Sequence, residues 1–300
     1  MNFYFFRDFF FSCVWEVFYP LDRKVTARIQ YRVGPPWYQS FADLLKLFGK
    51  ETLIPKNSSV TMFMLAPFLG MSALLVSGFI LYKINLFNMP GFLGDLIVMV
   101  YLFTIPSLSL ILGGFASSNP LSSLGSSREI KLLLGYELPF MLAILVPVIQ
   151  TGSIRFSEII QFQIEHGAVL YSISGSLAFI AVLLSVQAKM GLVPFDVAEA
   201  ETEILSGPLT EYSGPLLGIF KLNKMLMFSI LPLFVLSCFW GGFGNVNPLI
   251  NILKFLTIVV IFTLIRNTNP RLRVDQALRF FWFKLSVISS IAVILALGGM

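Results

Sequence analysis

Five carboxylates are crowded into one segment of the chain. They lie within sixteen residues, with no cation between them: Asp196, Glu199, Glu201, Glu203 and Glu211. Carboxylates held close together repel one another, which raises some of their pKa values toward neutrality. Such groups gain and lose protons at working pH, which is the chemistry of a proton relay or of a cation entry site. A solvated acidic loop is the alternative, but the apolar neighbours at 192–195, 204 and 205 favour partial burial.

Two more carboxylates lie next to an apolar run that begins near residue 136. Glu129 precedes this run, and Glu137 lies at or inside its start. A carboxylate at membrane depth costs several kcal/mol unless it is paired or hydrated, so Glu137 is a candidate functional residue. The alternative is a local ion pair with Arg128 or Lys131.

Two lysines lie inside another long apolar segment. Lys221 and Lys224 follow Ser213, which opens the segment, by about 12 and 17 Å along a helix. Snorkelling to the interface suits a lysine near a helix end. At this depth we expect instead that both lysines face the interior and pair with buried carboxylates.

A basic stretch opens the first polar segment. It contains Arg23, Lys24, Arg28 and Arg32. Gly-Pro-Pro at 34–36 ends any helix there. The following residues, 37–48, are mostly apolar but include Asp43 and Lys46, which predicts an amphipathic helix lying in the membrane interface. Such a segment either docks an acidic or structured partner or anchors the chain at lipid headgroups.

The residues that usually hold cofactors are scarce. The chain has two cysteines, without CxxC spacing, and one histidine. These counts exclude iron–sulfur, zinc and paired-histidine haem ligation within the chain. Neither a dinucleotide-binding glycine fingerprint nor a phosphate-binding loop occurs, and no basic surface domain suggests nucleic-acid binding. We therefore expect no catalytic, cofactor or metal site in this chain.

The elements that must position these groups are membrane helices. Of the 300 residues, 56% are hydrophobic and 12% charged, whereas roughly a quarter are charged in soluble domains. Apolar runs of about 20 residues recur throughout. We predict an all-α integral membrane protein, one domain over 1–300, with an interfacial amphipathic helix. About eight spans are predicted: 2–19, 60–82, 92–115, 136–152, 169–188, 213–239, 249–265 and 280–298.

The cations sort onto one side of these spans. Fourteen lie in alternate loops: Arg23, Lys24, Arg28, Arg32, Lys46, Lys50, Lys56, Arg128, Lys131, Lys189, Arg266, Arg271, Arg273 and Arg279. The opposite loops hold only Lys83 and Arg155. The positive-inside rule places loops 20–59, 116–135, 189–212 and 266–279 on the cytoplasmic side and both termini outside. An amphipathic stretch at 154–167 lies on the outer side.

Four separated motifs carry a resemblance to a known family. They read RKVTARIQYRVGPP, ADLLKLFGKE, Ser-Arg-Glu followed by Tyr136-Glu137, and PFDVAEAETEILSGPLTEYSG. Together they resemble the H-type (subunit 1) membrane anchor of complex I and of group 4 membrane-bound nickel–iron hydrogenases and sulfane sulfur reductase. The SSREIK…GYE form and the compact segment 34–39 look closest to the hydrogenase-type branch.

The resemblance implies roles for the charged residues. The proposed docking set for a peripheral redox arm is Arg23, Lys24, Arg28, Arg32, Asp43, Lys46 and Arg128. The proposed relay set, lining a cavity under the arm and continuing toward antiporter-like subunits, is Glu129, Glu137, Asp196, Glu199, Glu201, Glu203, Glu211, Lys221 and Lys224. The implied partners are a hydrogenase-like large subunit and an iron–sulfur small subunit, which would carry iron–sulfur clusters and, in the hydrogenases, a nickel–iron centre.

The resulting hypothesis is that this chain is a coupling subunit, without redox groups of its own, in an ion-translocating redox complex of a prokaryotic plasma membrane. It would dock the cytoplasmic arm and relay protonation or conformational change, without catalysing a reaction alone. Three alternatives remain: a quinone-binding subunit 1 of NADH dehydrogenase, a stand-alone secondary ion transporter, and a purely structural anchor. The absence of an internal repeat argues against the transporter. The coupling ion, H⁺ or Na⁺, and the terminal acceptor stay open.

Overall fold

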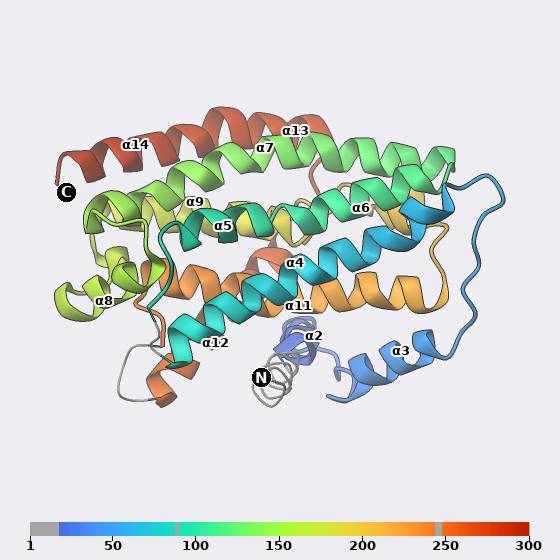
Figure 1. Ribbon diagram of the computed structural model, residues 1–300, viewed down its shortest axis with the longest axis horizontal. Coiled ribbons are helices and arrows are strands. Elements are labelled where there is room, and N and C mark those ends of the chain that lie inside the picture. Colours follow the sequence, from blue (N-terminus) through green and yellow to red (C-terminus); the bar gives the residue numbers. More distant parts are fainter. Residues whose placement is uncertain (1–17, 88–89, 244–247, 300) are drawn as a thin grey trace.

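A computed structural model describes residues 18–87, 90–243 and 248–299, without the side chains of 18–21, 201, 202 and 248. Within these ranges every regular element is a helix, and the long helices run side by side along the molecule (Figure 1). The elements are α2 Phe18–Ile29, α3 Gln39–Phe48, α4 Val60–Phe87, α5 Asp95–Leu102, α6 Ile105–Ala116, α7 Pro120–Thr151, α8 Phe156–His166, η1 Val169–Tyr171, α9 Ile173–Lys189, α10 Glu201–Ile204, η2 Gly207–Leu209, α11 Gly214–Phe239, α12 Pro248–Thr268, α13 Val274–Arg279, η3 Phe280–Leu285 and α14 Ser286–Leu297.

The all-α membrane fold is confirmed. Among the described residues, six helical stretches are long and apolar enough to span a membrane: Val60–Phe87, Asp95–Ala116, Pro120–Thr151, Gly214–Phe239, Leu249–Thr268 and Val274–Leu297. The shorter apolar helix α9 corresponds to a seventh predicted span. The predicted first span, 2–19, lies almost wholly outside the described residues. The two amphipathic stretches form α3 and α8.

The predicted loop 116–135 is mostly helical, because it joins the predicted span 136–152 in the single helix α7. The Asn119 side chain caps this helix by accepting a hydrogen bond from the Leu121 amide at 2.9 Å. Pro120 occupies the first turn, where its fixed φ angle suits a helix. Serine and glycine in 117–127 made this stretch look like a loop. In the fold Gly125 instead lets Pro208 of η2 pack against the helix.

Two other spans contain irregular turns. The predicted span 92–115 is divided between α5 and α6, where Pro106 lacks an amide hydrogen and the Thr104 hydroxyl donates to the Tyr101 carbonyl at 2.7 Å. The last predicted span begins at Val274, six residues before the predicted start, and η3 within it is a π-helical turn. Sequence periodicity does not reveal such local changes of pitch.

Helix α11 forms the centre of the bundle. In its most apolar window 89% of the residues are buried, a larger share than in any other described span. It contacts α4, α9, α12 and the amphipathic helix α3. Its Phe234 ring stacks on Phe156 of α8 at 5.7 Å and meets Phe103 edge-on at 5.0 Å. The helices that contact α11 therefore pack around its axis.

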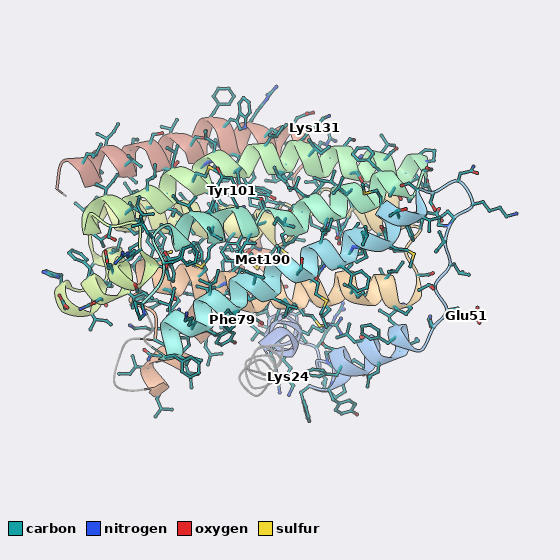
Figure 2. The ribbon with its side chains drawn as sticks, in the orientation of Figure 1. Lys24, Glu51, Phe79, Tyr101, Lys131 and Met190 are labelled. Carbon is teal, nitrogen blue, oxygen red and sulfur yellow. The ribbon has the colours of Figure 1, made fainter. Side chains whose placement is uncertain are left out.

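The bundle has two distinct ends (Figure 1). The C-terminal end of α14 and helix α8 lie at one end, and the segment 49–59 and the α6–α7 turn lie at the other. The Leu53 amide donates to the Ser213 hydroxyl at 3.0 Å, which joins this second end to the start of α11. The acidic segment 190–213 therefore runs from the middle of the bundle, where Met190 lies (Figure 2), to the end that carries the first polar loop.

Candidate functional site

A cavity of about 680 Å³ lies between α2, α3, α11, α12 and the segment 190–212. Its wall holds eight charged residues: Arg23, Asp43, Asp196, Glu199, Lys221, Lys224, Arg266 and Arg271. A second, smaller cavity of about 50 Å³ lies deeper in the bundle. The two share wall residues, among them Met190, which Figure 2 shows within the bundle. The smaller cavity extends the charged surface to Glu129 and Lys189.

Four of the carboxylates of the acidic segment have described side chains, and each contacts a different partner. Asp196 accepts from Arg271 at 3.1 Å, and Glu203 from Arg128 at 2.6 Å. Glu199 pairs with Lys224 of α11, and Glu211 accepts from the Asn119 amide at 2.5 Å. The sequence predicts mutual repulsion among these carboxylates. In the fold, cations from other elements counteract that repulsion, and the local sequence does not contain these cations.

Burial still acts on Asp196. Removal from water raises the pKa of its carboxyl to about 6, against the attraction of Lys224 and with the repulsion of Glu199. Asp196 lies in the connecting segment between α9 and α10, next to both cavities. It is therefore a group that changes its charge close to neutral pH at the boundary of the bundle.

The end of the acidic segment is fastened to α4 at a backbone carbonyl that a proline leaves without its helical donor. Pro67 has no amide hydrogen, so the Phe63 carbonyl one turn earlier lacks its helical donor. The Tyr212 hydroxyl donates to that carbonyl at 3.0 Å, and its ring stacks on Phe63 at 4.1 Å. Asn223 of α11 donates to the Pro67 carbonyl at 3.1 Å. These contacts fix the end of the segment against the bundle.

A line of hydroxyls leads inward from the smaller cavity. Glu129 of α7 is buried and hydrogen-bonds Ser107 of α6. The Ser107 hydroxyl lies 3.0 Å from the Tyr136 hydroxyl, where either atom can donate. Hydroxyl groups both donate and accept, so this line suits proton transfer. Neither Ser107 nor Tyr136 was predicted as a relay residue, although Tyr136 belongs to one of the four motifs, because a single serine or tyrosine in an apolar helix gives no spacing signal for such a role.

The line ends at a buried ion pair. The Lys189 ammonium, whose side chain is 0% exposed, donates to Glu137 Oε2 at 2.7 Å. The ammonium also lies 4.4 Å from the Phe140 ring centre and 5.2 Å from that of Tyr136, within cation–π range. Glu137 Oε1 is buried without a hydrogen-bond partner among the described residues.

Glu137 pairs with neither Arg128 nor Lys131, the two nearby cations that the sequence offered as partners. Arg128 pairs with Glu203 instead, and Lys131 is exposed on the surface of α7 (Figure 2). Lys189 was grouped with the loop cations, because it stands at the end of an apolar helix. Its pairing with a residue 52 positions earlier depends on the packing of α9 against α7.

The remaining predicted relay residues fall into three groups. Lys224 pairs with a carboxylate, that of Glu199, but both side chains are partly exposed rather than buried. Lys221 is exposed at the wall of the larger cavity and pairs with no carboxylate in the described part of the chain. Glu201 belongs to α10, but its side chain lies outside the described part of the structure.

The predicted docking residues lie at the mouth of the larger cavity or on the nearby surface. Arg23 donates to Asp43 of α3 at 3.4 Å, and both side chains are more than a third exposed. The other cations of the group are exposed: Lys24, Arg28, Arg32 and Lys46. Asp22, which no sequence pattern singles out, is buried and accepts from Arg266 at 2.5 Å and from Thr263 at 3.0 Å. This contact holds α2 against α12.

No group of three or more metal-ligating side chains occurs among the residues that the structure describes. The site is therefore built of carboxylates, ammonium and guanidinium groups and hydroxyls around two cavities. Such an arrangement can hold and move protons or bind cations. The fold and site together define a membrane-embedded helical subunit with a charged interior.

Comparison with known proteins places this subunit in a family. The sequence model of the NADH dehydrogenase family matches residues 3–297, and the chain belongs to that family. It is 36% identical to the H subunit of the NADH-quinone oxidoreductase of Syntrophotalea carbinolica, over 87% of this chain and 84% of that protein. It is 32% identical to the corresponding protein of Carboxydothermus hydrogenoformans, over 91% of this chain and 80% of that protein.

A solved structure agrees with the sequence relatives. A chain of the membrane-bound sulfane sulfur reductase, an archaeal respiratory membrane complex, superposes with a TM-score of 0.88 at 28% identity. The match covers 97% of both chains. The protein is therefore an H-type, multi-pass membrane subunit of a complex I-like respiratory assembly, which confirms the family resemblance of the four motifs.

Asp196 provides a test by pH titration. Its raised pKa means that the folded state keeps a proton that the unfolded chain, with an aspartate pKa of about 3.9, has already lost. This contribution to stability is fully present below the unfolded pKa and is lost as the pH rises through about 6. We expect the infrared band of protonated carboxyl groups to lose intensity over that upper range.

The Asp196→Asn variant should lack this loss of intensity. Glu203→Gln, which alters a more exposed carboxylate of the same segment, is the matched control and should keep it. An unchanged titration near pH 6 in Asp196→Asn would show that another group is responsible.

Proposed function

We propose that this chain couples redox events in a peripheral arm to ion movement in neighbouring membrane subunits. The observation that carries the proposal is the line of polar groups from the larger cavity to the interior. It runs through Asp196 and Glu199 to Glu129, Ser107 and Tyr136, and ends at the pair of Lys189 with Glu137. A purely structural anchor has no need of buried groups that can exchange protons.

The cavity is the proposed receiving end. Cations surround its mouth on α2 and the adjoining surface, and they suit an acidic or structured partner. The proposed docking set is Arg23, Lys24, Arg28, Arg32, Asp43, Lys46 and Arg128. A partner that brings a charge to this mouth changes the field at Asp196 and Glu199, because the low-dielectric walls screen it poorly.

The interior groups are the proposed transmitting path. Proton gain neutralises the Glu129 carboxylate, and the Ser107 and Tyr136 hydroxyls can reorient in response, because each can donate or accept a hydrogen bond. The Lys189 ammonium lies over the Tyr136 ring, so the loss of charge at Glu129 changes the field at this ammonium and alters its attraction to Glu137. The Glu137 side chain is 15% exposed, so a neighbouring membrane subunit can lie close enough to respond to a change in this pair.

The energy needed to move one ion across the membrane is modest. Moving one charge against about 150 mV costs roughly 3.5 kcal/mol. For a two-electron reaction this corresponds to a drop of roughly 75 mV in potential. The redox arm supplies that energy, so this chain needs only to connect the two events.

The proposal includes an orientation and partners. The cavity end faces the cytoplasm of a prokaryotic cell and both termini face outside, because the sorted cations favour this arrangement. In Figure 1 the C-terminus lies at the end of the bundle opposite the segment 49–59. Hydrogenase-like and iron–sulfur subunits would dock at the cavity and carry the redox cofactors, and antiporter-like subunits would adjoin the membrane face.

We place the chain with the hydrogenase and sulfane reductase branch. The SSREIK…GYE motif, the compact segment 34–39 and the similarity to the sulfane sulfur reductase chain support this placement. Quinone binding is the second candidate, since the sequence relatives are named NADH-quinone oxidoreductase subunits and the cavity has room for a small organic ligand.

Glu129 tests the relay. In the assembled complex, Glu129→Gln keeps the shape of the side chain but cannot carry a proton. We expect coupled ion transport to fall by about tenfold or more, in the range usual for loss of a proton-transfer group. The measurement is ion uptake per electron in vesicles. Glu165→Gln, on the exposed surface of α8, is the control and should match the parent. Full coupling in Glu129→Gln would refute the relay.

The terminal acceptor can be tested with the purified complex. We expect its electron transfer to protons or polysulfide to proceed without added quinone. Nickel analysis then separates hydrogenase from sulfane reductase. Electron transfer that requires a short-chain quinone would instead support the second candidate function.

A further inference from the structure

Two buried ionisable sites lie on opposite sides of a group of aromatic rings. On the cavity side is the pair of Lys189 with Glu137, where the polar line from the two cavities ends. On the other side is Asp95, the first residue of α5, which is 0% exposed. Its Oδ1 accepts from the amides of Leu96 at 2.7 Å and Phe156 at 2.8 Å. Phe156 opens α8, at the end of the bundle opposite the segment 49–59 (Figure 1).

The carboxylate at the α8 end has one oxygen that the fold leaves unused. Asp95 Oδ2 is buried and has no hydrogen-bond partner among the described residues. A buried charged oxygen without a partner is costly, and a bound proton removes that charge. Other polar groups at this end are satisfied: the Ser237 hydroxyl donates to Asn85 Oδ1 at 3.0 Å, and Gln163 Nε2 donates to the Cys238 carbonyl at 3.0 Å. Asp95 is therefore the group at this end that can take up a proton.

Four phenylalanines fill the space between the two sites. Each is at most 1% exposed, and they come from four parts of the fold: Phe103 directly after α5, Phe140 in α7, Phe156 in α8 and Phe234 in α11. The Phe234 ring centre lies 5.0 Å from that of Phe103, 5.7 Å from that of Phe156 and 6.3 Å from that of Phe140. The Lys189 ammonium lies 4.4 Å from the Phe140 ring centre. The rings thus form a continuous contact from the ion pair to the residue that binds Asp95.

This contact contains no group that can carry a proton. A phenyl ring has no exchangeable hydrogen, and a space lined only by apolar side chains stays dry. None of the four rings lines either cavity of the candidate site. Ordinary core packing explains why the rings are buried. It does not explain why the polar line stops at Phe140 while an unsatisfied carboxylate lies directly behind Phe156.

We propose that Phe103, Phe140, Phe156 and Phe234 form a proton barrier, the aromatic barrier, between the relay and Asp95. The barrier leaves the relay open to the cavity side only, because an unhydrated charge is too costly among the rings. Protons that Glu129 takes up from the cavities therefore cannot continue to Asp95, and this chain signals to its neighbours without conducting the ion. The proposal rests on the proposed relay for its cavity-side end.

Passive proton entry tests the barrier in the assembled complex without an electron donor. The complex is reconstituted into sealed vesicles, the outside is acidified, and a trapped dye reports the internal pH. Phe234→Asn replaces the ring by a smaller side chain whose amide can hydrogen-bond water. We expect proton entry to become about tenfold faster or more, because a tenfold change in rate needs only a small lowering of the barrier. An assembled Phe234→Asn complex with the parental rate would overturn the proposal.

Two matched variants separate a defined path from general damage. Phe234→Leu keeps the gap apolar and should let protons in no faster than the parent. Phe239→Asn places the same polar side chain in the same helix, at a buried ring that packs on Phe179 at 5.8 Å outside the four-ring group, and it should also stay tight. Fast entry in either variant would overturn the proposal. Phe103→Asn, at the irregular turn after α5, tests the same gap if Phe234→Asn does not assemble.

The far end of the path is tested through Asp95. Asp95→Asn keeps an oxygen that can accept from the Phe156 amide but cannot bind a proton. Combined with Phe234→Asn, it should return proton entry toward the parental rate. Entry that stays fast would show that Asp95 is not the far end and would overturn the proposal. Full coupling in Glu129→Gln together with fast entry in Phe234→Asn would refute the relay but support the barrier, so the two failures are distinguishable.

Discussion

The pairing of Lys189 with Glu137 shows the constraint on which this structure depends: an isolated charge is too costly in a low-dielectric interior. Removing one partner of a buried pair typically costs about 3–5 kcal/mol, because the other charge is left without compensation. The two residues come from α9 and α7, so the pair also fixes how those helices pack. The same constraint explains why charges of the acidic segment contact cations from α7, from α11 and from the connection between α12 and α13.

The constraint also applies to the backbone. Pro67 interrupts the hydrogen bonds of α4, and Tyr212 from the far end of the acidic segment supplies the missing donor. The defect in one helix is thereby repaired by the segment that carries the site. The fold and the site are for this reason inseparable, because the acidic segment contributes both titratable groups and structural contacts.

The sequence could predict the parts that depend on local pattern. Long apolar runs located the membrane helices, and the carboxylate-rich segment located the larger cavity wall at Asp196 and Glu199. The pairing of Lys224 with a carboxylate followed from its depth in α11. These inferences need only composition, spacing and the cost of burying charge.

Other features depend on contacts between distant residues. Glu137 meets Lys189 because two helices cross, and Ser107 meets Tyr136 for the same reason. The serine-rich start of α7 is capped by Asn119 and packs against Pro208 of a later turn, a contact for which Gly125 leaves room. Local sequence does not encode which partner arrives, so these parts of the site required the fold.

The interior pair offers the most direct test of coupling. In the assembled complex, the double variant Glu137→Gln with Lys189→Gln removes both charges and leaves no unpaired ion, so assembly should be retained. The number of ions transported per electron is then measured in sealed vesicles. If the pair couples the two events, the double variant assembles but no longer transports ions in proportion to electron flow. A parental ratio of ions to electrons would show that the pair serves structure alone and would contradict the account.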